Sequence, residues 1–169
     1  MNIILVGMRC CGKSSIGKLL AGKLDKKFVD IDDEIIKKEG KSIPEIIEEK
    51  GWEHFRKQEK AVTKEIAKNS DQIISTGGGT IVDLENAKAL KKSGKIIYLY
   101  ITPETSIARQ LKKKDRPPLT NRENLEEEVK EIYRNRNGIY CQHAEIIIER
   151  SNDRKKDTEL IIEKIKLYA

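Results

Sequence analysis

Two kinds of hydrophobic pattern alternate along this chain. Short apolar runs predict strands, and these runs lie at residues 3–6, 28–32, 72–76, 95–101 and 145–148. Between the runs, apolar residues recur every three or four positions, which is the spacing of a helix with one buried face. Strands that alternate with helices predict an α/β fold with a parallel sheet and right-handed crossover connections.

Capping residues indicate where several of the expected helices begin and end. Ser42 followed three residues later by Glu45 is a capping-box pattern, which predicts a helix start. Asp83 and Thr102 are expected to cap two further helices. Gly51 interrupts the helical pattern, so it should separate a short helix from the longer one that follows.

The last third of the chain contains one interruption and two helices. Residues 112–124 carry two prolines and clustered charges with no core spacing, which is typical of a mobile lid or of a solvated loop. The next helix is expected to end near residues 134–138, and the final helix to begin with Asp157 as its cap. The inward-facing residues expected in that final helix are Leu160, Ile161, Ile165 and Tyr168.

The length and composition fit one globular domain. The chain has 169 residues, of which 37% are hydrophobic and 37% charged, and one core is enough for a domain of this size. We see no linker, so residues 1–169 are expected to form a single domain. Its expected parts are a core of residues 1–31, 60–111 and 125–169, a helical insertion at residues 32–59 and a lid at residues 112–124.

Charge and cysteine content limit the partners that we expect. The net charge is +6, but basic residues are mixed with acidic ones and only 5% of residues are aromatic, which disfavours a nucleic-acid surface. An anionic small ligand explains the surplus equally well. No apolar run approaches the length of a membrane span, and three cysteines cannot form a disulfide framework. We therefore expect a soluble, cytoplasmic protein with no nucleic-acid or membrane partner.

The strongest chemical signal is a phosphate-binding loop. Residues 7–14 read GMRCCGKS, a G-x-x-x-x-G-K-S motif between an expected strand and an expected helix. Backbone N–H groups and the positive end of the helix favour phosphate there. Lys13 should reach the β- and γ-phosphates, and the Ser14 hydroxyl should ligate Mg²⁺. A simple glycine-rich turn is the alternative interpretation. The expected nucleotide-binding residues of this loop are Gly7, Arg9, Cys10, Cys11, Gly12, Lys13, Ser14 and Ser15.

Other candidate site residues are weaker when each is considered alone. Asp30 and Asp32 would share one face of an extended segment, but they could equally cap a helix and occupy its first turn. Arg56 on a helix is more commonly a solvated surface residue. Three glycines at residues 77–79 follow a buried strand, which indicates close approach to a ligand or only a flexible turn.

Taken together, these residues resemble the shikimate kinase family over almost the whole chain. The matching features are residues 7–14, Asp30-x-Asp32, Glu53-x-Phe55-Arg56-x-x-Glu59, residues 77–79, Arg116-Pro117-Pro118-Leu119 and Arg136-x-x-x-Tyr140. The resemblance implies ATP-dependent phosphorylation of the 3-hydroxyl of shikimate to shikimate 3-phosphate, in chorismate and aromatic amino acid biosynthesis. It also implies a nucleoside monophosphate kinase-like fold with strand order 2-3-1-4-5, a helical substrate-binding subdomain, a lid and commonly a monomer.

The resemblance implies a role for each residue of the shikimate site. Arg56 and Arg136 would hold the carboxylate, for which a planar guanidinium offers paired hydrogen bonds that lysine cannot. Asp32 would accept hydrogen bonds from the hydroxyls and orient or deprotonate the attacking one. Gly79, with Gly78, would offer backbone N–H groups at close approach.

The resemblance also implies how the phosphates and the metal are held. Phosphoryl transfer depends mainly on positioning and on stabilisation of charge. Lys13 would supply one cation at the γ-phosphate, and Arg116, brought in by lid closure, would supply another. Ser14 and Asp30 would hold Mg²⁺, with Asp30 acting through water. ATP and Mg²⁺ are therefore the expected cofactors.

The adenine pocket and the departures from the family pattern complete the expectations. Arg109 matches the position that stacks on adenine, and the turn at residues 150–154, including Asn152, is expected to complete that pocket. Cys10 replaces a glycine, so the loop could bend differently. Gly138 replaces a proline, which should loosen the helix end that carries Arg136. Cys10 and Cys11 could also be reactive thiols, or they could simply fill loop positions.

Two rival functions remain on the sequence alone. The same fold could phosphorylate another small metabolite, such as gluconate, or a nucleoside monophosphate. A nucleotide-dependent protein that binds nucleic acid is the rival from another class, and the scattered positive charge disfavours it.

Overall fold

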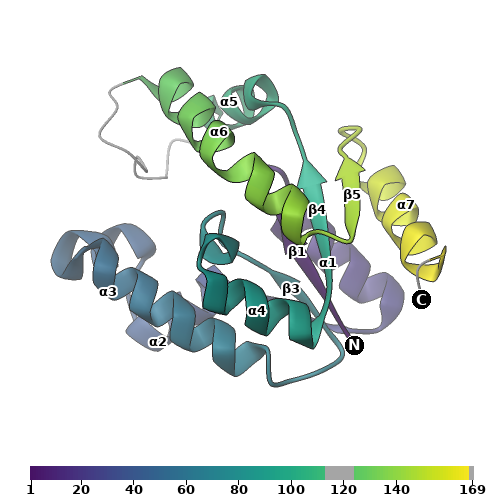
Figure 1. Ribbon diagram of the computed structural model, residues 1–169, viewed down its shortest axis with the longest axis horizontal. Coiled ribbons are helices and arrows are strands. Elements are labelled where there is room, and N and C mark those ends of the chain that lie inside the picture. The colour runs from purple at the N-terminus through teal and green to yellow at the C-terminus, as the bar shows by residue number, and fades with distance from the viewer. Residues whose placement is uncertain (113–123, 168–169) are drawn as a thin grey trace.

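The computed structural model describes residues 1–112 and 124–167, which form a five-stranded parallel sheet with helices on both faces (Figure 1). The strand order is β2-β3-β1-β4-β5, and every adjacent pair is parallel. Both the α/β class and the strand order that the sequence predicted are therefore confirmed. The strands are β1 (Asn2–Val6), β2 (Lys27–Asp30), β3 (Gln72–Ser75), β4 (Gly94–Tyr100) and β5 (Ile146–Glu149).

The helices form two layers, and α2 together with the first half of α3 projects to one side (Figure 1). One core cluster packs strand residues such as Ile4 and Tyr98 against α3, α4 and α6, and the second packs Leu5 and Ile97 against α1 and α7. The helices are α1 (Lys13–Leu24), α2 (Ile31–Glu39), α3 (Ile43–Ile66), the 3₁₀ turn η1 (Thr80–Val82), α4 (Leu84–Ser93), α5 (Pro103–Leu111), α6 (Leu125–His143) and α7 (Arg154–Leu167).

Burial on both faces explains the uniformly apolar central strands. Every residue of β1 is buried, and so are residues 96–99 of β4. Strands covered by helices on both faces need continuous apolar runs. At the sheet edge, β5 alternates buried and exposed residues, and Ile147 is 48% exposed. None of the described helices is sufficiently long and apolar to span a bilayer.

Most predicted caps are present. The Ser42 amide donates to Glu45 at 2.7 Å while Ser42 Oγ accepts from the Glu45 amide at 3.5 Å, which completes the capping box of α3. Asp83 caps α4 and Thr102 caps α5. Gly51 has φ 79° and ψ 169°, which is not helical, so α3 consists of two helical segments that meet at a kink, as predicted.

The boundary between β2 and α2 corrects one prediction. β2 ends at Asp30 rather than at residue 32, and Asp30 caps α2 by accepting from the Asp32 amide at 3.0 Å. Asp30 and Asp32 therefore do not lie on one extended segment. The capping interpretation was correct for this geometry, because an aspartate at this position satisfies an N–H group of the first turn that has no partner within the helix.

Three predictions about α6 and α7 were also wrong. α6 continues through Gly138 to His143, because the burial of Tyr140 outweighs a cost of about 1 kcal/mol for a helical glycine. Asp157 lies buried inside α7, and Asp153 accepts from the amides at residues 155 and 156 instead. Leu160 is 37% exposed rather than inward-facing. Tyr168 and most of the expected lid, including Arg116, lie outside the described residues.

Candidate active site

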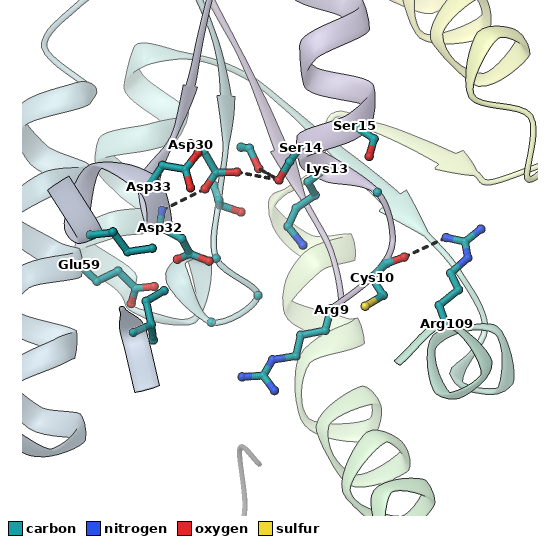
Figure 2. Close-up of a pocket in the computed structure, with 18 of the residues that line it drawn as sticks. Arg9, Cys10, Lys13, Ser14, Ser15, Asp30, Asp32, Asp33, Glu59 and Arg109 are labelled. Atoms are coloured by element: carbon teal, nitrogen blue, oxygen red, sulfur yellow. Dashed lines mark hydrogen bonds between the residues drawn. The ribbon is translucent and has the colours of Figure 1, made fainter. Parts of the chain in front are cut away.

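A cavity of about 670 Å³ opens at the carboxyl ends of the strands. The phosphate loop (residues 7–14) lines one side. The other side comes from α2, α3, α6 and the glycine loop, which we define as residues 77–79. Figure 2 shows Lys13 and Ser14 facing Asp30 and Asp32 across this space. Open α/β sheets bind ligands at this edge, so the cavity is the candidate active site.

The phosphate loop is held in shape by side chains that donate to its backbone carbonyl oxygens. Lys13 Nζ donates to the carbonyl oxygens of Gly7 at 2.8 Å and Met8 at 3.0 Å. Gly12 takes φ 98° immediately before α1. Cys10 takes φ 60°, so this cysteine adopts the left-handed conformation that normally favours glycine. The loop therefore accommodates the substitution, at the expense of local strain.

Oxygen donors gather where the loop meets β2 and β3. Ser14 Oγ donates to Asp30 Oδ2 at 2.7 Å and lies 3.4 Å from Ser75 Oγ. Burial, together with the negative charge of Asp30, raises the pKa of Asp33. No group of three His, Cys, Asp or Glu side chains suited to a metal occurs in the part of the chain that is described. Mg²⁺ commonly takes one or two protein oxygens, with phosphates and waters completing its shell, so Ser14 and Asp30 fit such an ion.

The opposite end of the cavity is built around Arg56 on α3. Its Nη1 donates to Glu59 Oε2 at 2.7 Å, and its guanidinium lies 5.4 Å from the ring centre of Trp52 and 5.3 Å from that of Phe55. Glu59 is buried, and its other oxygen accepts from Thr80 at 2.7 Å. These contacts fix the orientation of the Arg56 guanidinium group.

Three charged side chains that are distant in the sequence lie beside the glycine loop at this end of the cavity. A Cβ on Gly77 would lie 2.9 Å from Asp32 Oδ1, one on Gly78 would lie 3.7 Å from Arg136 Nη1, and one on Gly79 would lie 2.7 Å from Arg56 Nη2. No larger residue could replace Gly79 without displacing Arg56. All three charged side chains line the cavity, as the sequence interpretation required.

Arginines from α5 and the β5–α7 turn cover the far side of the phosphate loop. Arg109 Nη1 donates to the Cys10 carbonyl at 2.9 Å, and its other nitrogen contacts Asn152. Figure 2 shows Arg109 on the side of the loop opposite Asp32. Arg150 donates to the Cys11 carbonyl and, through Nε, to Asp157 Oδ2 at 2.6 Å.

Comparison with known proteins identifies the family. The shikimate kinase family model matches residues 9–166. The chain belongs to the shikimate kinase family. Family membership confirms the predicted enzyme class, an ATP-dependent kinase.

Relatives and solved structures agree with the shikimate kinase family. A shikimate kinase from Persephonella marina is 43% identical over 141 residues, which cover 83% of this chain and 84% of that protein. A bifunctional shikimate kinase/3-dehydroquinate synthase from Thermotoga maritima is 38% identical, and the match covers 96% of this chain but only 32% of that longer protein. A shikimate kinase from Acinetobacter baumannii, solved in complex with shikimate, has a TM-score of 0.94 at 33% identity and covers 99% of this chain and 93% of that one.

Two predicted nucleotide-binding residues of this shikimate kinase family member do not line the cavity. Gly7 is buried beside β4, where a Cβ would lie 2.7 Å from the Leu99 carbonyl. Cys11 is fully buried, and only its backbone carbonyl faces Arg150. For Cys11 the structure favours the simpler interpretation, in which the side chain fills space, because a reactive thiol must be accessible.

Sequence reasoning gave no role to three side chains that shape the site. Glu59 was part of a motif but was not assigned, although it orients Arg56. Thr80 and Tyr140 each bond a residue that lines the cavity. For Glu59 and Tyr140 the sequence offered a signal, because each lies one helical turn from an assigned arginine, at three and four positions from Arg56 and Arg136 respectively.

Proposed function

We propose that the protein transfers the γ-phosphoryl group of ATP to the 3-hydroxyl of shikimate, giving shikimate 3-phosphate. The observation that carries this proposal is the convergence of Asp32, Arg56 and Arg136 in one cavity whose other wall is the phosphate loop. Two cationic forks and a carboxylate suit a substrate that has one carboxylate and several hydroxyls.

Arg56 and Arg136 bind the shikimate carboxylate in this proposal. Arg56 is held by Glu59 at 2.7 Å and by two aromatic rings, so little side-chain freedom remains to be lost on binding. Arg136 approaches the same pocket from α6. Lysine could match the charge of either arginine but not its planar pair of donors.

Asp32 orients and deprotonates the attacking hydroxyl. It lies at the start of α2, beside the glycine loop and on the same side of the cavity as Asp30 (Figure 2). The backbone N–H of Gly79, assisted by Gly78, binds a second part of the acceptor. Loss of any one of these contacts would misplace the hydroxyl, and phosphoryl transfer is sensitive to position.

The phosphate loop, with its following Ser15, binds the nucleotide phosphates. Lys13 supplies positive charge at the γ-phosphate, and Arg116 supplies more when residues 112–124 close as a lid. Ser14 and Asp30 hold Mg²⁺, which neutralises phosphate charge when bound. Residues 32–59 form the substrate-binding subdomain, and the adenine ring lies between Arg109 and the turn that carries Asn152.

The cellular setting and the oligomeric state are also part of the proposal. The described residues contain three free cysteines and no disulfide, which fits a reducing cytoplasm. We propose a monomer that has neither nucleic-acid nor membrane partners.

The decisive experiment is shikimate-dependent ADP production by the purified protein with ATP and Mg²⁺. Gluconate and nucleoside monophosphates serve as competing acceptors in the same assay. Of these acceptors, we expect only shikimate to cause ADP release. Preference for a nucleotide acceptor would instead support a nucleoside monophosphate kinase activity. Salt-dependent RNA binding without shikimate turnover would support the nucleic-acid alternative.

A further inference from the structure

The hydroxyl of Tyr140 reaches the glycine loop from inside the protein core. Tyr140 is fully buried on α6, and its Oη donates to the carbonyl oxygen of Gly78. The Tyr98 ring packs 5.0 Å from the Tyr140 ring between centres, which fixes the plane of the phenol. The hydrogen bond therefore joins a buried, packed side chain to a glycine-rich turn.

The glycine loop needs such a tether because it cannot carry side chains of its own. A Cβ on Gly79 would meet the Arg56 guanidinium at 2.7 Å, and one on Gly77 would meet Asp32 at 2.9 Å. Glycine avoids these collisions, but consecutive glycines leave the backbone free to adopt several conformations. A contact from outside the glycine loop must therefore select one of these backbone conformations.

Because a peptide unit is planar, the hydrogen bond to the Gly78 carbonyl also sets the direction of the Gly79 N–H group. The Gly78 carbonyl and the Gly79 N–H belong to one planar trans peptide, so they point in opposite directions. The carbonyl points toward buried Tyr140, whereas Gly79 lines the cavity. The Gly79 N–H is therefore directed toward the cavity side of the loop.

We propose that Tyr140 is a positioning residue that sets the Gly78–Gly79 peptide so that the Gly79 N–H can bind the acceptor substrate. This inference rests on the proposed shikimate kinase activity. Tyr140 lies one helical turn after Arg136, on the same face of α6. α6 therefore supplies both Arg136, which binds the acceptor substrate, and Tyr140, whose hydrogen bond aligns the Gly79 N–H group.

The phenol remains protonated over the range in which a kinase is assayed. Burial raises the pKa of Tyr140 to about 12, and the nearby positive charge of Arg136 opposes this rise only in part. The hydroxyl therefore keeps its proton and acts as a donor to the Gly78 carbonyl. A pH profile of the wild type should show no contribution from Tyr140 in the neutral range.

The first test is Tyr140→Phe, which removes the hydroxyl and keeps the ring. We expect the KM for shikimate to rise about tenfold, the loss typical of one neutral hydrogen bond, while the KM for ATP stays within about twofold. Tyr98→Phe is the matched control, because Tyr98 is also fully buried but donates to Asn137 at 2.9 Å instead. That variant should lose thermal stability without a change in either KM.

The second test uses the wild type alone, so it does not depend on a variant that folds. The protein has eleven glycines, so ¹⁵N-glycine labelling gives a spectrum simple enough to follow the Gly79 amide. Shikimate at saturation should slow hydrogen exchange of that amide about tenfold or more, as burial of an exposed donor requires.

The outcomes separate the inference from the proposed function. Shikimate turnover by the wild type, with an unchanged shikimate KM in Tyr140→Phe, would overturn the role of Tyr140 and leave the kinase activity intact. An unchanged hydrogen-exchange rate of the Gly79 amide on shikimate binding would likewise overturn the role of Tyr140 and leave the kinase activity intact. A wild type that neither binds nor phosphorylates shikimate would remove the proposed function, and this inference with it.

Discussion

The two ends of the cavity are built in different ways. At the phosphate end, Lys13 bonds carbonyl oxygens of its own loop, and most of the donors for phosphate are backbone groups within eight consecutive residues. At the acceptor end, Asp32, Arg56 and Arg136 come from three separate helices. A local motif makes the first end, whereas the packing of the whole domain makes the second.

This difference predicts where substitutions act. Side chains at the phosphate end, apart from Lys13 and Ser14, can change as long as the backbone keeps its course, as Cys10 illustrates. Side chains at the acceptor end depend on buried partners such as Glu59 and Tyr140. Substitutions there should change binding of the acceptor far more than binding of ATP.

The largest expected effect is at Asp32. Asp32→Asn should lower kcat by about 10²–10⁴, the usual contribution of a positioned general base, while ATP still binds. Steady-state kinetics with shikimate and an equilibrium titration with ATP measure the two quantities. Glu34→Gln on the same helical turn is the control, because Glu34 forms a surface ion pair with Lys37. An unaltered kcat for Asp32→Asn would exclude Asp32 from the chemistry.

Arg56 should show a smaller and more selective effect. Arg56→Lys keeps the charge but loses the planar fork that Glu59 holds at 2.7 Å. We expect the KM for shikimate to rise about 10- to 100-fold, which corresponds to roughly 1.4–2.8 kcal/mol. Lys57→Gln, at an exposed neighbouring position, should leave kinetics unchanged. An unchanged KM for shikimate in Arg56→Lys would contradict the proposal that the Arg56 guanidinium binds the shikimate carboxylate.

Asp157 tests one of the long-range supports of the phosphate end, the contact of Arg150 with the Cys11 carbonyl. Burial opposes its ionisation, but hydrogen bonds from Arg150 and Ser151 hold the pKa of Asp157 below its usual value of 3.8. A carboxyl whose folded pKa is lowered stabilises the fold above its unfolded pKa, and this contribution is lost as the pH falls through the folded pKa. Asp157→Asn should lower the free energy of unfolding by about 1.5–3 kcal/mol at pH 7.

Urea unfolding at pH 7, 4 and 3 measures this prediction. The difference in stability between the wild type and Asp157→Asn should begin to shrink below about pH 4, where the carboxyl of the unfolded wild type becomes protonated. It should shrink further as the pH falls through the lower pKa of the folded state. Asp153→Asn provides the comparison, since Asp153 caps the same helix from the surface. A difference that stays constant with pH would show that the charge of Asp157 does not support the loop.

The smallest expected effect is a gain at Cys10. Cys10→Gly should raise the free energy of unfolding by about 0.5–1 kcal/mol, because relief of the left-handed strain exceeds the added entropy of the unfolded chain. Activity should change little if the loop binds phosphate through its backbone. Cys141→Ser, at an exposed helical position, is the control for loss of a thiol. A less stable Cys10→Gly variant would show that the thiol itself holds the loop.

The sequence by itself determined the parts of this protein that depend on neighbouring residues. Apolar runs and helical spacing gave the five strands and the α/β class, and the phosphate loop could be read from eight residues. The capping box at Ser42 and the kink at Gly51 followed for the same reason. Each of these features is set by interactions within a few positions of the chain.

Only the tertiary structure decided how distant parts meet. The end of β2 at Asp30, the continuation of α6 past Gly138 and the pairing of Asp157 with Arg150 depend on burial against other elements. Family resemblance suggested Arg56 and Arg136, but only folding shows Glu59 aiming one and Tyr140 holding the loop between them. The physical reason is that Gly78 and its buried partner Tyr140 lie 62 positions apart, where no local pattern links them. Glu59 and Arg56 lie one helical turn apart, so only the burial of Glu59 needed the tertiary structure.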